Sequence, residues 1–233
     1  MPTGSQADIC GMFSFLARRY DLFNMLASLG MDRGWRGKVS GMVRDGSRVL
    51  DLCAGTGDLC LEIARKHKGC RIEALDFCPE MLEEGKRKAL IQGAGRAINW
   101  TCGEACKMPY PDATFDIIVC GFALRNLSDE LDGVFSECYR VLRDGGTLIA
   151  LDLTRPVNPL AKFLYGVYLR AVIPAIGLTL YGKISPFRYL ARSILDFYGP
   201  DEVKAKLAGA GFSECRYEPL AFGAAGIYST ARR

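Results

Sequence analysis

Short runs of apolar residues recur along the first two thirds of the chain, and segments with helical spacing separate them. The apolar runs cover residues 48–53, 71–76, 98–102, 115–120 and 147–153, and each is bounded by Gly, Pro, Asp or Asn. Residues 129–143 place apolar side chains three and four positions apart, which is the spacing of one helix face, and Pro79 opens another expected helix at 79–90. Strands that alternate with helices are typical of an α/β protein with a parallel sheet and right-handed crossovers.

The C-terminal part of the chain follows a different pattern. A helix expected at 200–210 ends at Gly211, and two strand-like runs follow at 213–220 and 224–231, with a glycine-containing bend between them. Two such runs joined by a bend are typical of an antiparallel hairpin. We therefore expect a mixed sheet of about seven strands, mostly parallel and completed by a C-terminal hairpin.

The stretch 157–184 interrupts the alternation of strands and helices. It is apolar, with Lys162, Arg170 and Lys183 spaced through it and Pro174 in the middle. A membrane-spanning helix needs about 20 predominantly apolar residues, whereas the longest charge-free piece here runs only from residue 171 to 182. The pattern favours a packed helical insertion over a membrane span, and it leaves open a lid or a surface that touches lipid or an apolar ligand.

Composition excludes several classes of protein. The chain has 233 residues, 24% of them charged and 49% hydrophobic, which argues against disorder, and a net charge of +4 is too small to indicate nucleic-acid binding. The single histidine, His67, excludes a zinc site built on several histidines, and we expect no metal. Ten cysteines without a C-x-x-C pair, and no signal-peptide pattern, indicate reduced thiols in a cytoplasmic protein.

A glycine-rich turn follows the first expected strand. It reads Asp51-Leu52-Cys53-Ala54-Gly55-Thr56-Gly57-Asp58. Gly55 and Gly57 allow a tight turn and a close approach of the backbone to a ligand at the N-terminus of the next helix. A dinucleotide fingerprint would require a third glycine at position 60, where the chain has Cys60, so NAD is disfavoured.

Two further acids follow the next two expected strands. Asp76 closes the second strand, where a carboxylate can accept the hydroxyls of a ribose, and Glu104 follows the third, where it can help to read an adenine edge. Any one acid at a strand end could be a turn or capping residue. Three acids at the carboxyl ends of three successive strands indicate a ligand site, because open α/β sheets bind ligands at that edge.

These residues resemble the class I S-adenosylmethionine methyltransferases, which have D-x-x-x-G-x-G after the first strand and acids after the second and third. Several segments are similar, more specifically, to the menaquinone/ubiquinone biosynthesis C-methyltransferase family (UbiE/MenG). They are Tyr20-Asp21-x-x-Asn24, Arg33-x-Trp35, residues 49–59 (VLDLCAGTGDL), Met108-Pro109-Tyr110, Phe115-Asp116, residues 122–126 (FALRN), residues 140–146 (RVLRDGG), residues 187–194 (FRYLARSI) and Ala210-Gly211-Phe212. The matches extend from about residue 15 to 228.

The resemblance implies a Rossmann-like domain over residues 1–233 that binds S-adenosylmethionine. Within it we expect an N-terminal helical cap (1–45), a cofactor-binding core (46–153), a helical substrate lid (154–198) and a C-terminal helix with a hairpin (199–233). The expected cofactor residues are Asp51, Gly55, Thr56, Gly57, Asp76, Phe77, Glu104, Ala105 and Gly121. The family often has Ser at the last position, so Gly121 leaves only a backbone contact there.

The activity that the resemblance implies is C-methylation of a prenylated quinol, either demethylmenaquinol or a ubiquinol precursor. That reaction needs a proton acceptor and a group that stabilises a phenolate. Arg125 is the candidate for the phenolate, oriented by Asn126, and Tyr20 and Asp21 are further catalytic candidates, with Asp21 as a possible base. The alternatives are an Arg125–Asp152 pair at a strand end and a helix-surface pair formed by Tyr20 and Asp21.

The chain departs from the family at three places. It has Asp32 where His-Arg-x-Trp is common, residues 226–228 (GIY) where a histidine is often found, and Asp152 in place of Glu. Another phenolic substrate, or a non-catalytic protein that binds S-adenosylmethionine, therefore stays open. As partners we expect the small-molecule quinol and no nucleic acid, with peripheral membrane contact through 157–184 and a homodimer left open.

Overall fold

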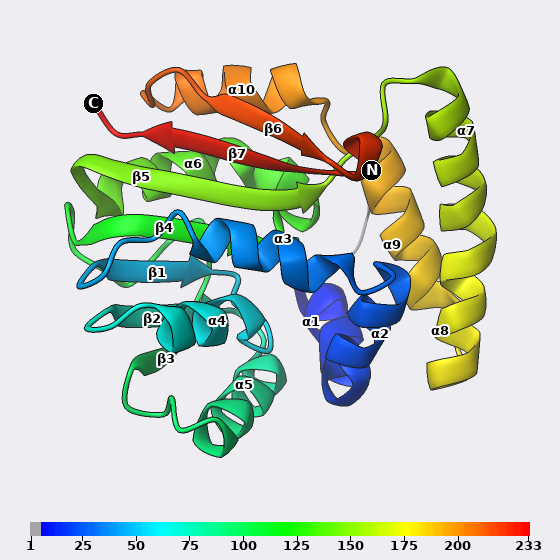
Figure 1. Ribbon diagram of the computed structural model, residues 1–233, viewed down its shortest axis with the longest axis horizontal. Coiled ribbons are helices and arrows are strands. Elements are labelled where there is room, and N and C mark those ends of the chain that lie inside the picture. Colours follow the sequence, from blue (N-terminus) through cyan, green and yellow to red (C-terminus); the bar gives the residue numbers. More distant parts are fainter. Residues whose placement is uncertain (1–5) are drawn as a thin grey trace.

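The computed structural model describes residues 6–233 as ten α-helices and seven strands (Figure 1). The helices are α1 (Gln6–Leu16), α2 (Tyr20–Ala27), α3 (Met31–Ser40), α4 (Asp58–Lys66), α5 (Pro79–Ile91), α6 (Leu131–Val141), α7 (Pro159–Val167), α8 (Ile173–Tyr181), α9 (Ser185–Asp196) and α10 (Pro200–Gly209). The strands are β1 (Arg48–Leu52), β2 (Arg71–Asp76), β3 (Ile98–Cys102), β4 (Phe115–Gly121), β5 (Leu142–Leu153), β6 (Arg216–Leu220) and β7 (Ala225–Ala231).

All seven strands form one sheet in the order β3-β2-β1-β4-β5-β7-β6. Strands β1 to β5 pair in parallel, and β7 pairs antiparallel with both β5 and β6. The predicted α/β fold, a mostly parallel seven-stranded sheet with a C-terminal hairpin, is confirmed. Because β1 to β5 are parallel, their carboxyl ends lie at the same edge, which is where the candidate ligand residues were expected.

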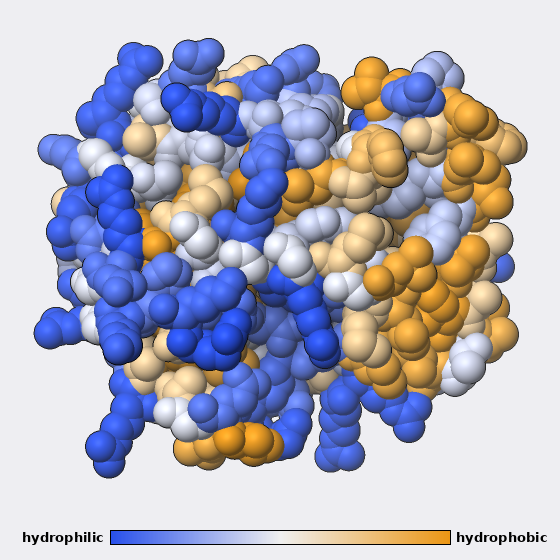
Figure 2. All heavy atoms as spheres, viewed as in Figure 1, coloured by the Kyte–Doolittle hydropathy of each residue, from blue (hydrophilic) through white to orange (hydrophobic). Residues whose placement is uncertain are grey.

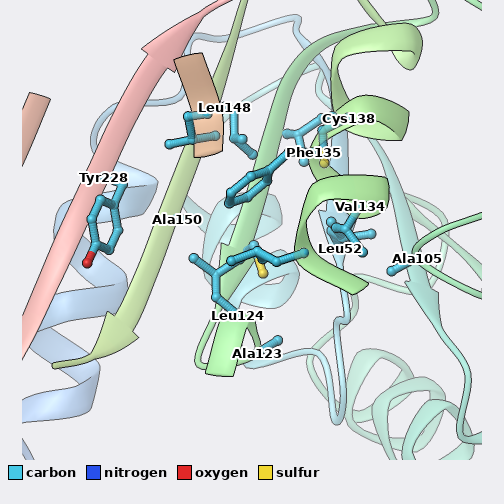
Figure 3. Packing of buried hydrophobic residues seen from close by; sticks show 14 of the residues in the cluster. Leu52, Ala105, Ala123, Leu124, Val134, Phe135, Cys138, Leu148, Ala150 and Tyr228 are labelled. Atoms are coloured by element: carbon cyan, nitrogen blue, oxygen red, sulfur yellow. The ribbon is translucent and has the colours of Figure 1, made fainter. Parts of the chain in front are cut away.

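Helices cover both faces of the sheet and enclose two apolar cores. On one face, α3, α4 and α5 contribute buried side chains such as Val39, Ile63 and Ala89. On the other face, α6 and α10 pack on the sheet, and Phe135 of α6 lies close to Leu148 of β5 (Figure 3). The near-continuous apolar strands detected in the sequence reflect this burial on both faces.

A third core lies beyond the carboxyl edge of the sheet and joins the N-terminal helices to the lid helices. Phe23 of α2 packs against Phe187 of α9 with 4.7 Å between ring centroids, and Ile173 of α8 lies in the same cluster. A Cβ atom at Gly177 of α8 would lie 1.9 Å from the Phe187 ring, so only glycine allows this close approach. The cap and the lid therefore form one layer over the edge at which the strands end.

The lid begins with a long helix in three parts. Helix α7, a π-helical turn (Tyr168–Val172) and α8 follow one another without a break, and together with α9 they stand at one side of the molecule (Figure 1). By length and composition, the helix Pro159–Tyr181 is long and apolar enough to cross a membrane. Its inner side packs against α2 and α9, whereas the apolar side chains of Leu160, Phe163 and Leu164 are exposed.

Several boundaries differ from the sequence expectation, most of all where α6 meets β5 and at the start of β6. The helix expected at 129–143 ends at Val141, because Leu142 is already extended and pairs with Phe115 of β4, before an irregularity in the β4–β5 register. The residues that were expected to stop the helix, 144–146, lie inside β5, where Gly145 has a positive φ of 73°. The last hairpin is shorter than expected, since β6 begins at Arg216.

Candidate functional site

The turn between β1 and α4 carries the glycine motif. Gly55 and Gly57 have φ angles of 55° and 77°, in the left-handed region that favours glycine. A Cβ atom at Gly55 would lie 3.3 Å from the terminal methyl of Met81, whereas one at Gly57 would lie 2.4 Å from Cη2 of Trp100. The second glycine therefore makes room for a tryptophan ring, which the motif alone did not reveal.

Two carboxylates hold this turn in place. Asp76, at the end of β2, accepts hydrogen bonds from the N–H groups of Gly55 (2.8 Å) and Cys78 (2.9 Å), and burial raises the pKa of Asp76. Asp51 is 1% exposed and accepts a hydrogen bond from the N–H of Cys60 in the first turn of α4, at 2.9 Å. Burial raises the pKa of Asp51 to about 7.

A first cavity, of about 320 Å³, opens at the carboxyl ends of β1, β2 and β4. Six of the expected cofactor residues line it, namely Gly55, Asp76, Phe77, Glu104, Ala105 and Gly121. Four of its lining residues are acidic, and none of the described lining residues is Lys, Arg or His. Such a cavity suits a ligand that carries positive charge and hydroxyl groups, and it is unfavourable for a phosphate group.

The remaining expected cofactor residues, Asp51, Thr56 and Gly57, do not line this cavity. Asp51 accepts its hydrogen bond at the start of α4, and Gly57 leaves space for the Trp100 ring. Thr56 is 3% exposed and donates a hydrogen bond from Oγ1 to Asp21 Oδ1 at 2.6 Å. These three residues therefore contact other parts of the protein around the turn and are not part of the cavity lining.

Asp21 belongs to a chain of charged side chains that joins the cap to the core. Its Oδ2 atom lies 2.5 Å from Lys88 Nζ of α5, and Lys88 also pairs with Asp58 of α4. The Oδ2 atom of Asp58 in turn lies 3.3 Å from Nη2 of Arg36 in α3, and Arg36 also forms an ion pair with the buried Asp32. Asp32, one of the departures from the family pattern, is thus a partner of Arg36. Asp21 is absent from the lining of the first cavity and of the second, described next.

A second cavity, of about 340 Å³, lies between the cap, the lid and the C-terminal hairpin. Its lining is mainly apolar and aromatic, with Phe23, Leu153, Leu169, Ile173 and Phe222 among its walls. Polar groups reach it from Tyr20, Asn24, Asp32, Arg125, Tyr165 and Tyr168. Few polar groups in an apolar cavity are the usual composition of a site for a largely hydrophobic small molecule.

Tyr20 and Phe122 line both cavities and so mark the place where they meet. Phe122 follows β4 with a φ of 62°, which is an uncommon conformation for a bulky residue, and its N–H group donates to Leu151 O at 2.7 Å. Burial raises the pKa of Tyr20, although the nearby Arg125 opposes that shift. The phenol of Tyr20 therefore keeps its proton and can act as a hydrogen-bond donor at this junction.

Arg125 and Asn126 are neighbours in sequence, but they line different cavities. Asn126 lines the first cavity and Arg125 the second, and a crevice of about 30 Å³ touches both. Arg125 is 4% exposed, and its Nη1 lies 2.7 Å from Oδ1 of the fully buried Asp152. Burial is the largest single effect and lowers the pKa of Arg125, but the charge of Asp152 and the hydrogen bond to it, together with Tyr20 and Tyr165, outweigh burial and the pKa is raised. Its Nε atom is buried without a hydrogen-bond partner among the described residues.

Several lining residues were not singled out from the sequence. Ile9 and Phe13 of α1 and the acids Asp129 and Glu130 line the first cavity, and Tyr165 lines the second. The two acids follow the end of β4 after a short segment, a signal comparable to that of Glu104. The α1 side chains have no such signal, because only the docking of the cap brings them to the edge of the sheet.

Comparison with solved structures defines the class of protein. The fold is similar to a putative O-methyltransferase from Nostoc punctiforme (TM-score 0.70, 16% identity, 94% of this chain and 60% of that chain). It is also similar to a SAM-dependent methyltransferase from Thermotoga maritima (TM-score 0.67, 16% identity, 96% and 99% of the two chains). The chain therefore has the fold of the class I S-adenosylmethionine-dependent methyltransferases.

Sequence comparison defines the family. A model of the ubiE/COQ5 methyltransferase family matches residues 2–232, and the chain belongs to this family. Relatives include the demethylmenaquinone methyltransferases of Deinococcus radiodurans (36% identity, 100% of this chain and 97% of that protein) and Thermus thermophilus (38%, 93% and 98%). The ubiquinone/menaquinone biosynthesis C-methyltransferase UbiE of Geotalea daltonii is 37% identical over 94% of this chain and 93% of its own length. The protein is a methyltransferase, and family and fold imply S-adenosylmethionine as the methyl donor.

Proposed function

We propose that this methyltransferase moves a methyl group from S-adenosylmethionine to a ring carbon of a prenylated quinol, either demethylmenaquinol or a ubiquinol precursor. The observation that carries the proposal is the pair of cavities that meet at Tyr20 and Phe122. One cavity is acidic and lies at the strand ends, and the other is apolar and contains Arg125. Holding two reactants in adjoining cavities supplies the proximity that group transfer needs.

The first cavity is proposed as the S-adenosylmethionine site. Its acidic lining fits a molecule with a sulfonium and an amino group. Because Gly55 has no side chain, the space beside Met81 stays open, whereas a larger residue at position 55 would occupy it. Asp76 and Glu104 are proposed to hold the ribose hydroxyls and the adenine edge, with Phe77, Ala105 and Gly121 forming the walls. When bound, S-adenosylmethionine supplies an electrophilic methyl group.

The second cavity is proposed to hold the quinol, with Arg125 close to a ring oxygen. Loss of a proton from a ring hydroxyl raises the electron density on the adjacent carbon, and the resulting negative charge needs a cationic partner. The Arg125 guanidinium stays protonated, and Nε has no other partner to satisfy among the described residues. A fixed cation in an enclosed cavity stabilises such a charge more strongly than water does.

We assign Tyr20 and Asn126 to orientation, and Asp21 to holding the cap. Tyr20 keeps its proton and can donate a hydrogen bond at the junction of the cavities. Asn126 lies on the cofactor side of the same crevice that Arg125 touches. The Asp21 carboxylate is engaged by Lys88 and Thr56, and we propose that it fastens α2 to the core and does not act as the base.

We further propose peripheral contact with a membrane surface through the lid. Residues 153–195 contain six Lys or Arg residues and no Asp or Glu. The apolar side chains of Leu160, Phe163, Leu164 and Val167 are exposed on α7, and Figure 2 shows apolar side chains gathered over α2, α7 and α8. Such a combination of exposed apolar and basic residues suits an anionic lipid interface. A prenylated substrate would then reach the second cavity from the lipid phase.

The function is tested by incubating the protein with labelled S-adenosylmethionine and chemically reduced demethylmenaquinone that carries a long or a short prenyl tail. We expect label on the quinol ring, with higher kcat/KM for the longer tail, because the second cavity and the exposed lid offer apolar contacts. An unlabelled ring, in a preparation that binds S-adenosylmethionine, would overturn the proposal. Transfer to an untailed phenol at equal efficiency would point to a different phenolic substrate.

A further inference from the structure

Two thiols and a carboxylate meet where helix α1 crosses the start of α5. They are Cys10 of α1, Cys78 at the N-cap of α5, and Glu80 in the first turn of α5. The two Sγ atoms and a carboxylate oxygen of Glu80 all lie within 4.8 Å of one another. This cluster does not line either cavity, but its neighbours in sequence line the first one: Ile9 and Phe13 on α1, and Phe77 and Met81 on the other side.

The cluster therefore joins two segments that both contribute residues to the lining of the proposed cofactor cavity. Phe13 and Cys10 of α1 pack against a small buried group that contains Cys78 and Met81. The Cys78 thiol also lies 3.8 Å from the backbone oxygen of Cys10. Any covalent link between the two cysteines would hold α1 against the start of α5, and so would limit the opening of the cavity on this side.

The arrangement favours a link between the thiols over a bound metal ion. The hydroxyl of Ser14 lies among the three groups, 3.4 Å from Cys78 Sγ, 3.9 Å from Cys10 Sγ and 2.8 Å from Glu80 Oε2. It occupies space that an ion at the centre of the cluster would need. A disulfide requires no added atom, only an approach of the two sulfurs to the usual bond length of about 2.0 Å.

We propose that Cys10 and Cys78 form a reversible disulfide that fastens α1 over the cofactor cavity and slows cofactor exchange. A peroxide is the oxidant of the two thiols, and the reaction has two steps. Cys10 is oxidised to a sulfenic acid while hydrogen peroxide is reduced to water. The Cys78 sulfur then attacks the Cys10 sulfur, forming the S–S bond and releasing the hydroxyl as a second water. A dithiol reductant restores both thiols.

Cys10 and Cys78 differ in exposure and in hydrogen bonding, and we therefore expect them to have different roles in this reaction. Cys10 is partly exposed and can meet the peroxide first, whereas Cys78 is fully buried. Burial raises the pKa of Cys78 to about 12, so it rests as a thiol and must lose a proton when it attacks. The Glu80 carboxylate lies 3.4 Å from Cys78 Sγ and faces solvent, so it is placed to accept that proton and to pass it to the leaving hydroxyl, which departs as water.

Two measurements on the full chain test the proposal. After hydrogen peroxide treatment, non-reducing peptide mass spectrometry should detect residues 10 and 78 in one cross-linked species that dithiothreitol removes. In parallel, the dissociation rate of labelled S-adenosylmethionine should fall about tenfold or more and recover on reduction. The second measurement rests on the proposed cofactor cavity, whereas the first does not, and neither requires methyl transfer to a quinol.

Two matched variants distinguish the effect of the Cys10–Cys78 disulfide from the effect of oxidising other cysteines. Cys10→Ser should bind S-adenosylmethionine normally and show neither the cross-link nor the change in dissociation rate. Cys102→Ser, which removes an exposed cysteine at the end of β3, should behave like the unaltered protein. Absence of the 10–78 cross-link after peroxide treatment would overturn the disulfide. A cross-link that leaves the dissociation rate unchanged would overturn its role as a fastening of α1.

Discussion

Asp152 accepts two hydrogen bonds from Arg125, one from Nη1 at 2.7 Å and one from the backbone N–H at 3.1 Å. The strand-end ion pair that was the alternative interpretation of Arg125 is therefore present. It does not compete with the proposed role, because Arg125 also lines the second cavity and its Nε has no partner among the described residues. Asp152 holds the guanidinium in a fixed orientation, which is how a charge-stabilising group is kept ready.

Replacing Arg125 by Lys should lower kcat about 100-fold and leave the Kd for S-adenosylmethionine within about twofold. Lysine keeps the charge beside Asp152 but is shorter and lacks the planar donor set. Isothermal titration calorimetry and a labelled-methyl assay measure the two quantities. Arg143→Lys, at an exposed surface pair with Asp116, is the control and should change neither. A parallel loss of cofactor affinity and turnover would mean that Arg125 only supports the fold.

Replacing Glu104 by Gln should raise the Kd for S-adenosylmethionine about tenfold and change kcat little. A hydrogen bond that involves a charged group contributes roughly 1.5–3 kcal/mol, and an exposed carboxylate such as Glu104 lies at the lower end of that range. Equilibrium dialysis with labelled cofactor gives the affinity. Glu214→Gln, also exposed but not part of the cavity lining, should bind as the unaltered protein does. Equal affinities for the two variants would remove Glu104 from the proposed site.

The sequence was sufficient to place the candidate residues at the strand ends together, because topology alone brings them to one edge of the sheet. Asp76 and Gly121 are the last residues of β2 and β4, and Glu104 follows β3; parallel pairing puts those ends at one edge of the sheet. Side-chain direction within the glycine motif could not be predicted in the same way. Asp51 and Gly57 belong to the motif, but one binds the start of α4 and the other makes room for Trp100.

The contacts of the N-terminal residues could not be predicted from the sequence, for a different reason. Asp21 meets Thr56 and Lys88, which are 35 and 67 positions away, only because α2 docks on the core in one particular orientation. No periodicity or spacing encodes that docking. Most of the aromatic and apolar residues that line the second cavity come from the cap, the lid and the hairpin, and they depend on the same long-range packing.

The Trp100 ring should make both Gly57 and Gly85 intolerant of alanine, and Gly57 carries a second cost from its backbone conformation. A Cβ at either glycine would lie 2.4 Å from a ring atom of Trp100, but only Gly57 has a positive φ. We expect Gly85→Ala to lower the free energy of unfolding by about 1–3 kcal/mol, and Trp100→Leu in the same chain to restore part of the loss. Gly57→Ala should be restored less, because the backbone strain persists. Urea denaturation of the two pairs measures this, and equal restoration would contradict it.

The buried carboxyl of Asp51 should make stability depend on pH. Its pKa is raised from the ordinary 3.8 to about 7 in the folded protein, so the folded state binds a proton that the unfolded chain releases. As the pH rises from about 4 to about 7, the free energy of unfolding that this group contributes should therefore decrease, by at most about 4 kcal/mol. Asp51→Asn can still accept from the Cys60 N–H and should flatten the dependence. Asp144→Asn, at an exposed side chain, should not.

The exposed lid should bind anionic vesicles through both its apolar and its basic residues. Exchanging Phe163 and Leu164 together for Glu should lower co-sedimentation with phosphatidylglycerol vesicles at least tenfold, since each exposed apolar side chain contributes about 1.5–3 kcal/mol when buried. Lys162→Glu should weaken binding to anionic vesicles only, with a loss that added salt abolishes. The control is Leu90→Glu, a 75% exposed position on α5.

Methyl transfer to a short-tailed quinol in solution should survive the Phe163 and Leu164 exchange, because neither residue lines the second cavity. Transfer to a long-tailed quinol held in vesicles should fall with vesicle binding, which separates access to the membrane from chemistry. If this face instead joins two copies of the chain, sedimentation equilibrium will show a dimer that the exchange dissociates, without vesicle binding in either form. That result would replace the lipid surface by a homodimer interface.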